Sequence, residues 1–176
     1  MKHFLIVVDM QKDFVSGSLG SGAAEKIVPA AVRRIEAFEG EIIATLDTHF
    51  DNYLSTAEGR KLPVPHCIRG TQGWELDMRI GEVLKEKNCR RIEKNTFGST
   101  MLPELLRQSA AGEPFDMLLI GLCTDICVVS NALYLKANFP EYPVSVDAAC
   151  CAGVSEATHR AALETMRCCQ IEILND

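Results

Sequence analysis

The chain lacks an excess of basic residues. Its 18 lysines and arginines are outnumbered by 24 aspartates and glutamates, which leaves a net charge of −6 at pH 7. A protein whose main partner is a nucleic acid needs a basic face for the phosphates. The composition therefore argues against nucleic-acid binding as the main role.

The chain also lacks the sequence features of membrane, exported and zinc-ribbon proteins. No apolar run approaches the length of a membrane-spanning helix. The opening MKHFLIVVDM has an apolar stretch too short for a signal peptide, and Asp9 interrupts it. None of the eight cysteines forms a CxxC pair, so most are expected to be small buried apolar groups. We expect a cytoplasmic protein with no membrane partner.

What the sequence does contain is a regular alternation of apolar runs and helical patterns. The runs expected to form strands are residues 4–8, 41–46, 90–93, 117–120, 143–146 and 171–174. Strands that alternate with helices favour right-handed crossovers, and hence a parallel sheet with helices on both faces. The length of 176 residues suits one domain. The sequence thus predicts a single α/β domain over residues 1–176, a three-layer α/β/α fold with a six-stranded parallel sheet.

The stretch 115–133, FDMLLIGLCTDICVVSNAL, has the pattern of a strand, a turn and a helix. Its apolar run is expected to end at Gly121, and Thr124 and Asp125 are suitable N-cap residues for the helix that follows. Cys127 then falls in the first helical turn, where the positive end of the helix dipole favours a thiolate. A buried, unreactive cysteine is the alternative interpretation.

Two further helix starts can be read from capping residues. Ser99 or Thr100 is expected to cap a helix with Leu102 and Leu105 on its apolar face. Ser155 is expected to cap the last helix, which should run to about residue 166.

Polar residues follow the first three expected strands. Asp9 follows the first strand, Asp47 and His49 follow the second, and Lys94 follows the third. The carboxyl ends of parallel strands meet at one edge of the sheet, which is where open α/β sheets bind their ligands. We therefore expect these side chains to converge near Cys127. For Asp9 taken alone, a solvated turn acid is the alternative.

A metal site is one interpretation of the second strand end and the long loop over residues 50–73. Asp47 and His49 alternate along an extended chain, so both can face one point, and His66 can supply a third ligand. Two histidines and one carboxylate leave open coordination positions, as a catalytic or ligand-binding metal requires. Surface histidines in a loop are the alternative, although loops of this length are usually functional.

With these residues in place, the chain resembles the nicotinamidase–isochorismatase superfamily of cysteine hydrolases. The resemblance runs from VVDMQKDFVSGSLG to DAACCAGVSEATHRAAL. The family's acid, lysine and cysteine fall on Asp9 in VVDMQKDF, Lys94 in EKNTFGS and Cys127 in GLCTDICV. LDTHF and LPVPHCIRGTQGWE resemble the metal-binding stretch of the nicotinamidase branch.

The resemblance implies roles for the catalytic residues. Lys94 would hold Asp9 ionised and favour the Cys127 thiolate, and Asp9 would accept the thiol proton. Cys127 would attack the carboxamide carbon while the backbone N–H groups of Cys123 and Cys127 stabilise the oxyanion. A cis peptide bond before Cys123 is also implied.

The resemblance also implies a cofactor, one divalent metal ion. Its ligands would be Asp47, His49 and His66, with Glu58 as a weaker fourth candidate. Zinc is favoured, and iron or manganese also suit this set of ligands.

The implied reaction is the hydrolysis of nicotinamide to nicotinate and ammonia, with NAD salvage as its context. The metal would orient the pyridine ring, and Phe14 and Leu122 would contact the substrate. Ile126 and Pro63 depart from residues that many nicotinamidases carry, which leaves open another small amide, such as a pyrazinamide-like, N-carbamoyl or ureide compound. A non-enzymatic metal-binding or redox module is a third alternative. The expected partner is a small amide, and a homo-oligomer is compatible with the sequence.

Overall fold

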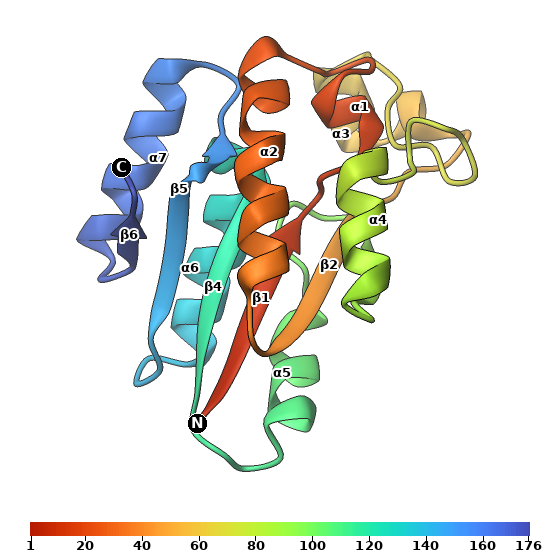
Figure 1. Cartoon of the computed structure of the whole chain (residues 1–176). Coiled ribbons are helices and arrows are strands. Elements are labelled where there is room, and N and C mark those ends of the chain that lie inside the picture. The colour runs from red at the N-terminus through yellow and green to blue at the C-terminus, as the bar shows by residue number, and fades with distance from the viewer.

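Six parallel strands form one sheet in the computed structural model, which describes residues 1–176 (Figure 1). The strands are β1 (Lys2–Val8), β2 (Glu41–Asp47), β3 (Arg90–Lys94), β4 (Phe115–Leu122), β5 (Val144–Ala152) and β6 (Glu172–Leu174). Their order in the sheet is β3-β2-β1-β4-β5-β6, and every neighbouring pair is parallel. The predicted six-stranded parallel sheet is confirmed.

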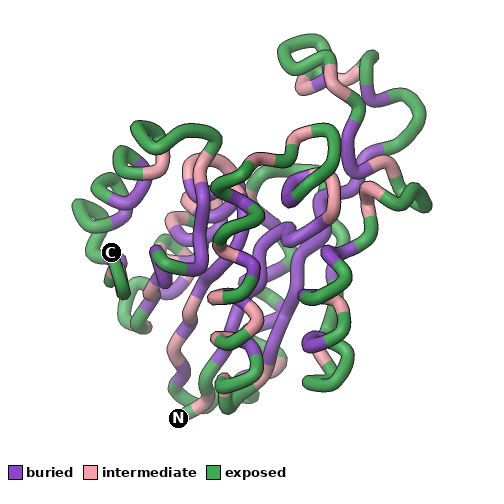
Figure 2. The backbone as a smooth tube through the Cα atoms, turned by 45° about the horizontal axis from the view of Figure 1, so that its top comes forward, coloured by how far each residue is buried: buried purple, intermediate pink, exposed green.

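Helices cover both faces of this sheet (Figure 1). They are α1 (Lys12–Val15), α2 (Gly22–Ala37), α3 (Ala57–Lys61), α4 (Met78–Glu86), α5 (Leu102–Ala110), α6 (Val129–Asn138) and α7 (Glu156–Cys168). Successive strand residues point to opposite faces. In β1, Leu5 and Val7 pack under α2 and α4, whereas Phe4 and Ile6 pack toward α5, α6 and α7. The four central strands are therefore buried on both sides, while the edge strands β3 and β6 and the outer faces of the helices are more exposed (Figure 2).

Two strands differ from the apolar runs that predicted them. Gly121 does not end β4 but lies inside it with a φ of 122°. A Cβ at this position would lie 2.1 Å from the carbonyl oxygen of Val8, so only glycine allows β4 to approach β1 this closely. β5 is longer than expected because it contains a bulge: Leu119 pairs with Val146, but Gly121 pairs with Cys151.

The expected cap at Ser99 or Thr100 is wrong, whereas the cap at Ser155 is confirmed. α5 has Met101 at its N-cap and begins at Leu102, with a proline in its first turn whose fixed φ suits a helix start. α7 begins with a capping box in which the Ser155 side chain accepts a hydrogen bond from the N–H of Thr158.

The long connection over residues 50–73 is not structureless. It contains a short 3₁₀ helix (Tyr53–Ser55) and α3, whose N-cap Thr56 accepts a hydrogen bond from the N–H of Gly59. No helix in the protein is both long and apolar enough to cross a membrane.

Candidate active site and adjoining metal cluster

The register of the sheet sets three of the expected side chains at one edge. Lys94 pairs with Asp47 across β3 and β2, and Val8 pairs with Thr45 across β1 and β2. The N–H of Asp9, directly after β1, donates to the Thr45 carbonyl oxygen at 3.2 Å. The strand order reverses between β1 and β4, which is the point where open α/β sheets place their ligands.

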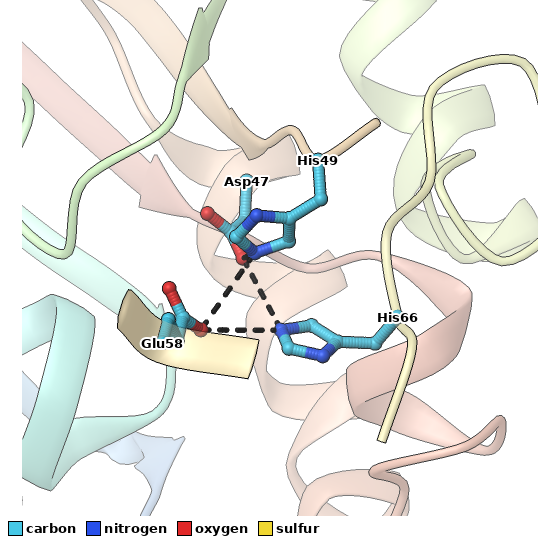
Figure 3. Close-up of side chains that lie close together, drawn as sticks. All are labelled: Asp47, His49, Glu58 and His66. Carbon is cyan, nitrogen blue, oxygen red and sulfur yellow. Dashed lines mark hydrogen bonds and ion pairs between the residues drawn. The ribbon is translucent and has the colours of Figure 1, made fainter. Parts of the chain in front are cut away.

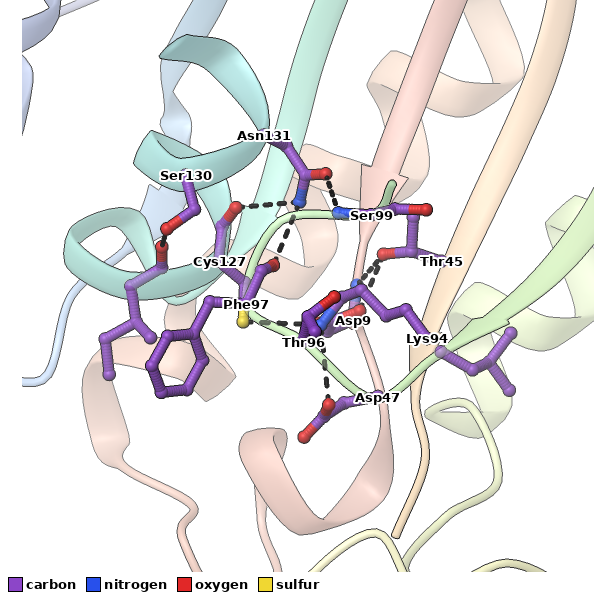
Figure 4. Close-up of polar contacts among 12 residues, drawn as sticks. Asp9, Thr45, Asp47, Lys94, Thr96, Phe97, Ser99, Cys127, Ser130 and Asn131 are labelled. Atoms are coloured by element: carbon purple, nitrogen blue, oxygen red, sulfur yellow. Dashed lines mark hydrogen bonds and ion pairs between the residues drawn. The ribbon is translucent and has the colours of Figure 1, made fainter. Parts of the chain in front are cut away.

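Lys94 lies between Asp9 and Cys127 (Figure 4). Its Nζ is 2.6 Å from Asp9 Oδ2 and 3.5 Å from Cys127 Sγ. Thr45 Oγ1 donates to the other carboxylate oxygen, Asp9 Oδ1, at 2.6 Å. All four residues are buried. The structure thus brings together the acid, the lysine and the cysteine that the sequence singled out.

Burial is the largest single influence on the pKa values of Asp9, Lys94 and Cys127. It raises the pKa of Asp9, against the opposing effects of the Lys94 ammonium and the Thr45 hydroxyl. Burial also disfavours the Lys94 ammonium, but the charges of Asp9, Cys127 and Asp47 outweigh it and raise the Lys94 pKa. Burial, and then the charge of Asp9, raise the pKa of Cys127 well above its usual range. Burial of Cys127 thus opposes the thiolate that the helix terminus and Lys94 are expected to favour, and burial also makes the neighbouring Asp9 carboxylate more basic.

The turn that carries Cys127 also differs from expectation. Thr124 and Asp125 do not cap the helix: residues 124–128 form a π-helical turn with Cys123 at its N-cap, and α6 follows directly with Val128 at its N-cap. Both side chains make tertiary contacts instead. Thr124 Oγ1 lies 2.8 Å from His159 Nδ1, and Asp125 accepts hydrogen bonds from the N–H of Val154. The peptide bond between Leu122 and Cys123 is cis, as the resemblance implied.

A second cluster lies beside this group and contains all four candidate metal ligands (Figure 3). His49 Nε2 and His66 Nε2 lie 2.9 Å and 3.6 Å from Asp47 Oδ2. Glu58 Oε1, from the first turn of α3, lies 3.7 Å and 3.6 Å from the same two nitrogens. The four ligand atoms all lie within 4.8 Å of one another, so the cluster can hold one metal ion.

The donor set fits a divalent ion. His66 Nδ1 lies 2.8 Å from the carbonyl oxygen of Val64, which can only accept, so Nδ1 carries a proton and, in the neutral imidazole, the lone pair of Nε2 faces the cluster. Two imidazole nitrogens and two carboxylates suit zinc, iron or manganese. Burial alone would raise the pKa of Asp47, but contacts with His49, His66 and Lys94 lower it far below its usual range.

The two clusters share Asp47. Its Oδ2 faces the histidines, while its Oδ1 lies 3.4 Å from Lys94 Nζ. Lys94 therefore contacts the candidate base, the candidate nucleophile and a candidate metal ligand at once.

Gln11 has no role that the sequence predicts, but it is fully buried at this edge. Its Nε2 donates to the carbonyl oxygens of Asp47 and Trp74, both at 2.8 Å, and its Oε1 accepts from the N–H of Asp47 at 2.7 Å. Asp13 likewise accepts a hydrogen bond from the N–H of Cys67, next to His66. Gln11 and Asp13 follow Asp9 at alternate positions, and this spacing is the signal that the sequence offers for them. Their hydrogen-bond partners depend on tertiary structure.

Of the two residues expected to contact the substrate, Phe14 lies beside the metal cluster and Leu122 lies in the core. The ring of Phe14 lies 5.5 Å from that of His66, beside the metal cluster. The side chain of Leu122 is buried in the core beneath α2 and α4, so the site can contact Leu122 only through its backbone.

Comparison with known proteins agrees with this geometry. Residues 3–175 match the isochorismatase domain model. The chain belongs to the isochorismatase family. Within this family, it is 30% identical to the nicotinamidase/pyrazinamidase of Mycobacterium tuberculosis, with 97% of each chain covered.

Solved structures of this family share the fold. The crystal structure of a nicotinamidase/pyrazinamidase from Bacillus subtilis matches with a TM-score of 0.88 and 26% identity, covering 99% of this chain and 100% of that one. The pyrazinamidase of Pyrococcus horikoshii, in complex with zinc, matches with a TM-score of 0.82 and 26% identity over the full length of both chains.

Proposed function

We propose that this isochorismatase-family protein is a single hydrolase domain over residues 1–176 that converts nicotinamide to nicotinate and ammonia through a thioester on Cys127. The observation that carries the proposal is the position of Lys94, which contacts Asp9, Cys127 and Asp47 together. The similarity to nicotinamidases supports the choice of amide.

The reaction begins with proton transfer from the Cys127 thiol to Asp9. The thiolate attacks the carboxamide carbon, and the N–H groups of Cys123 and Cys127 are the proposed donors to the oxyanion. Asp9 then gives its proton to the amide nitrogen, which departs as ammonia and leaves a thioester on Cys127. Asp9 next takes a proton from water, the hydroxide attacks the thioester, and nicotinate leaves as the Cys127 thiol regains its proton.

Asp47, His49, Glu58 and His66 are the residues proposed to hold a divalent ion, with zinc favoured and iron or manganese as alternatives. When bound, the ion would supply a Lewis-acidic contact for the pyridine nitrogen and so help to orient the ring. Phe14 would pack against that ring from the side of His66.

The test is the formation of nicotinate and ammonia from nicotinamide by the purified protein. Both products should appear in equal amounts, and Cys127→Ala should abolish their formation. Release of ammonia from an N-carbamoyl or ureide compound but not from nicotinamide would instead favour another amide and reject the proposed substrate.

A further inference from the structure

A buried asparagine connects the nucleophile turn to the segment that follows Lys94. Asn131 lies in the first turn of α6 and is fully buried. Its Nδ2 donates to the carbonyl oxygen of Cys127 at 2.8 Å and to that of Phe97 at 3.3 Å, and its Oδ1 accepts from the N–H of Ser99 at 2.8 Å (Figure 4). One carboxamide thus joins two segments that meet only in the folded protein.

One segment carries Lys94 and the other carries Cys127, and the distance between these two side chains affects the pKa of the thiol. The segment from Lys94 to Ser99 is fixed at its start, where the Lys94 carbonyl oxygen accepts from the N–H of Thr48 at 2.8 Å. Its far end is fixed by Asn131. Between these points Gly98 lies against α6, where a Cβ would be 3.2 Å from the Ser130 carbonyl oxygen.

We propose that Asn131 is a positioning residue that sets the distance between the Lys94 ammonium and the Cys127 thiol. This inference rests on the proposed function, since it concerns the same nucleophile. A carboxamide suits this role because it offers two N–H donors and one acceptor in a fixed plane, and the site satisfies all three. In a buried site each of these bonds is costly to break, because the partner is then left without water.

The bond to Cys127 alone would not require this residue. On the exposed end of the same helix, Asn138 makes the same kind of bond, donating to the carbonyl oxygen of Tyr134, four residues earlier, at 2.9 Å. Asn131 differs because it also holds Phe97 and Ser99. Asn138 is therefore a matched control for the helical bond without the connection to the Lys94 segment.

The experiment compares Asn131→Leu and Asn131→Asp with Asn138→Leu and Asn138→Asp. Leucine keeps the size of asparagine and removes every hydrogen bond, whereas aspartate keeps the acceptor for Ser99 and removes both donors. Each variant is assayed for kcat and KM on nicotinamide, for the rate at which iodoacetamide alkylates Cys127, and for Tm. The alkylation rate is read by mass spectrometry of the Cys127 peptide, so it does not depend on substrate.

We expect both Asn131 variants to lose about tenfold or more in kcat with little change in KM, because displacement of a reacting group by about an ångström can cost about a hundredfold. Alkylation of Cys127 should slow as well, since Lys94 is the group that lowers the pKa of this thiol. The Asn138 variants should match wild type in both measurements. If the leucine variant does not fold, the aspartate variant still decides.

Folded Asn131 variants with wild-type kcat and alkylation rate, and only a lower Tm, would overturn the inference and leave Asn131 a structural residue. If wild type does not hydrolyse nicotinamide, the proposed function fails. The alkylation rates then still report whether Asn131 positions Cys127.

Discussion

The hydroxyl of Thr45 should control the pH at which the enzyme becomes active. Thr45 Oγ1 donates to Asp9 Oδ1 at 2.6 Å, and both residues are fully buried. Thr45→Val keeps the shape of the side chain and removes the donor. Because the hydrogen bond stabilises the ionised carboxylate, its loss should raise the pKa of Asp9 above its already raised value.

The size of this change follows from the charge on the acceptor. A hydrogen bond to a charged group contributes about 1.5–3 kcal/mol, and about 1.4 kcal/mol corresponds to one pKa unit. Lys94 still faces the other oxygen, Asp9 Oδ2, at 2.6 Å, so the lower end of this range applies. We expect a shift of about one pH unit.

The assay is the pH profile of kcat/KM for nicotinamide. Activity requires ionised Asp9, so it is lost as the pH falls through the pKa of that group. In Thr45→Val this acid limb should move to higher pH, with the plateau least affected. Thr165→Val, which removes a hydroxyl that bonds only within the exposed face of α7, should leave the profile unchanged. An acid limb that stays in place or moves to lower pH would refute the role of Asp9 as the base.

Three further predictions follow from burial and contacts. Cys127→Ala should eliminate ammonia release from nicotinamide. Cys150→Ala should leave ammonia release near wild type, because the Cys150 side chain packs in the core and burial raises its pKa to about 11. His66→Ala should lower the bound metal measured by elemental analysis but leave alkylation of Cys127 unchanged, and full occupancy would show that His66 is not a ligand. Gly121→Ala should cost about 2 kcal/mol or more in urea unfolding, whereas Gly22→Ala, where a Cβ meets nothing within 4 Å, should not destabilise.

The parts of the site that could be predicted from sequence are those fixed by strand periodicity. Asp9, Asp47 and Lys94 each follow a buried apolar run, and parallel strands deliver their carboxyl ends to the same edge. The alternation of Asp47 and His49 also holds in the structure, where both side chains face His66. Local sequence is sufficient here because side chains along an extended strand point alternately to its two faces.

Predictions failed where a side chain had a distant partner. Thr124 and Asp125 have the composition of caps, but contacts with α7 and the segment after β5 use their oxygens instead. The raised pKa of Cys127 could not be predicted for a related reason, since the sequence shows the helix start but not the burial that opposes the thiolate. The bonds that Gln11 and Asn131 make across the fold have no local pattern at all.

The most direct test of the central claim is ammonia release from nicotinamide, pyrazinamide and benzamide at equal concentration, with the metal-loaded protein. The first two amides carry a ring nitrogen meta to the carboxamide carbon, and this nitrogen is the proposed contact for a metal ion held by Asp47, His49, Glu58 and His66. Benzamide has nearly the same shape, and Phe14 can still pack on its ring, but it has no ring nitrogen. Nicotinamide and pyrazinamide should therefore be hydrolysed, and benzamide should be slower by about a hundredfold. Equal rates for benzamide and nicotinamide would contradict the central claim.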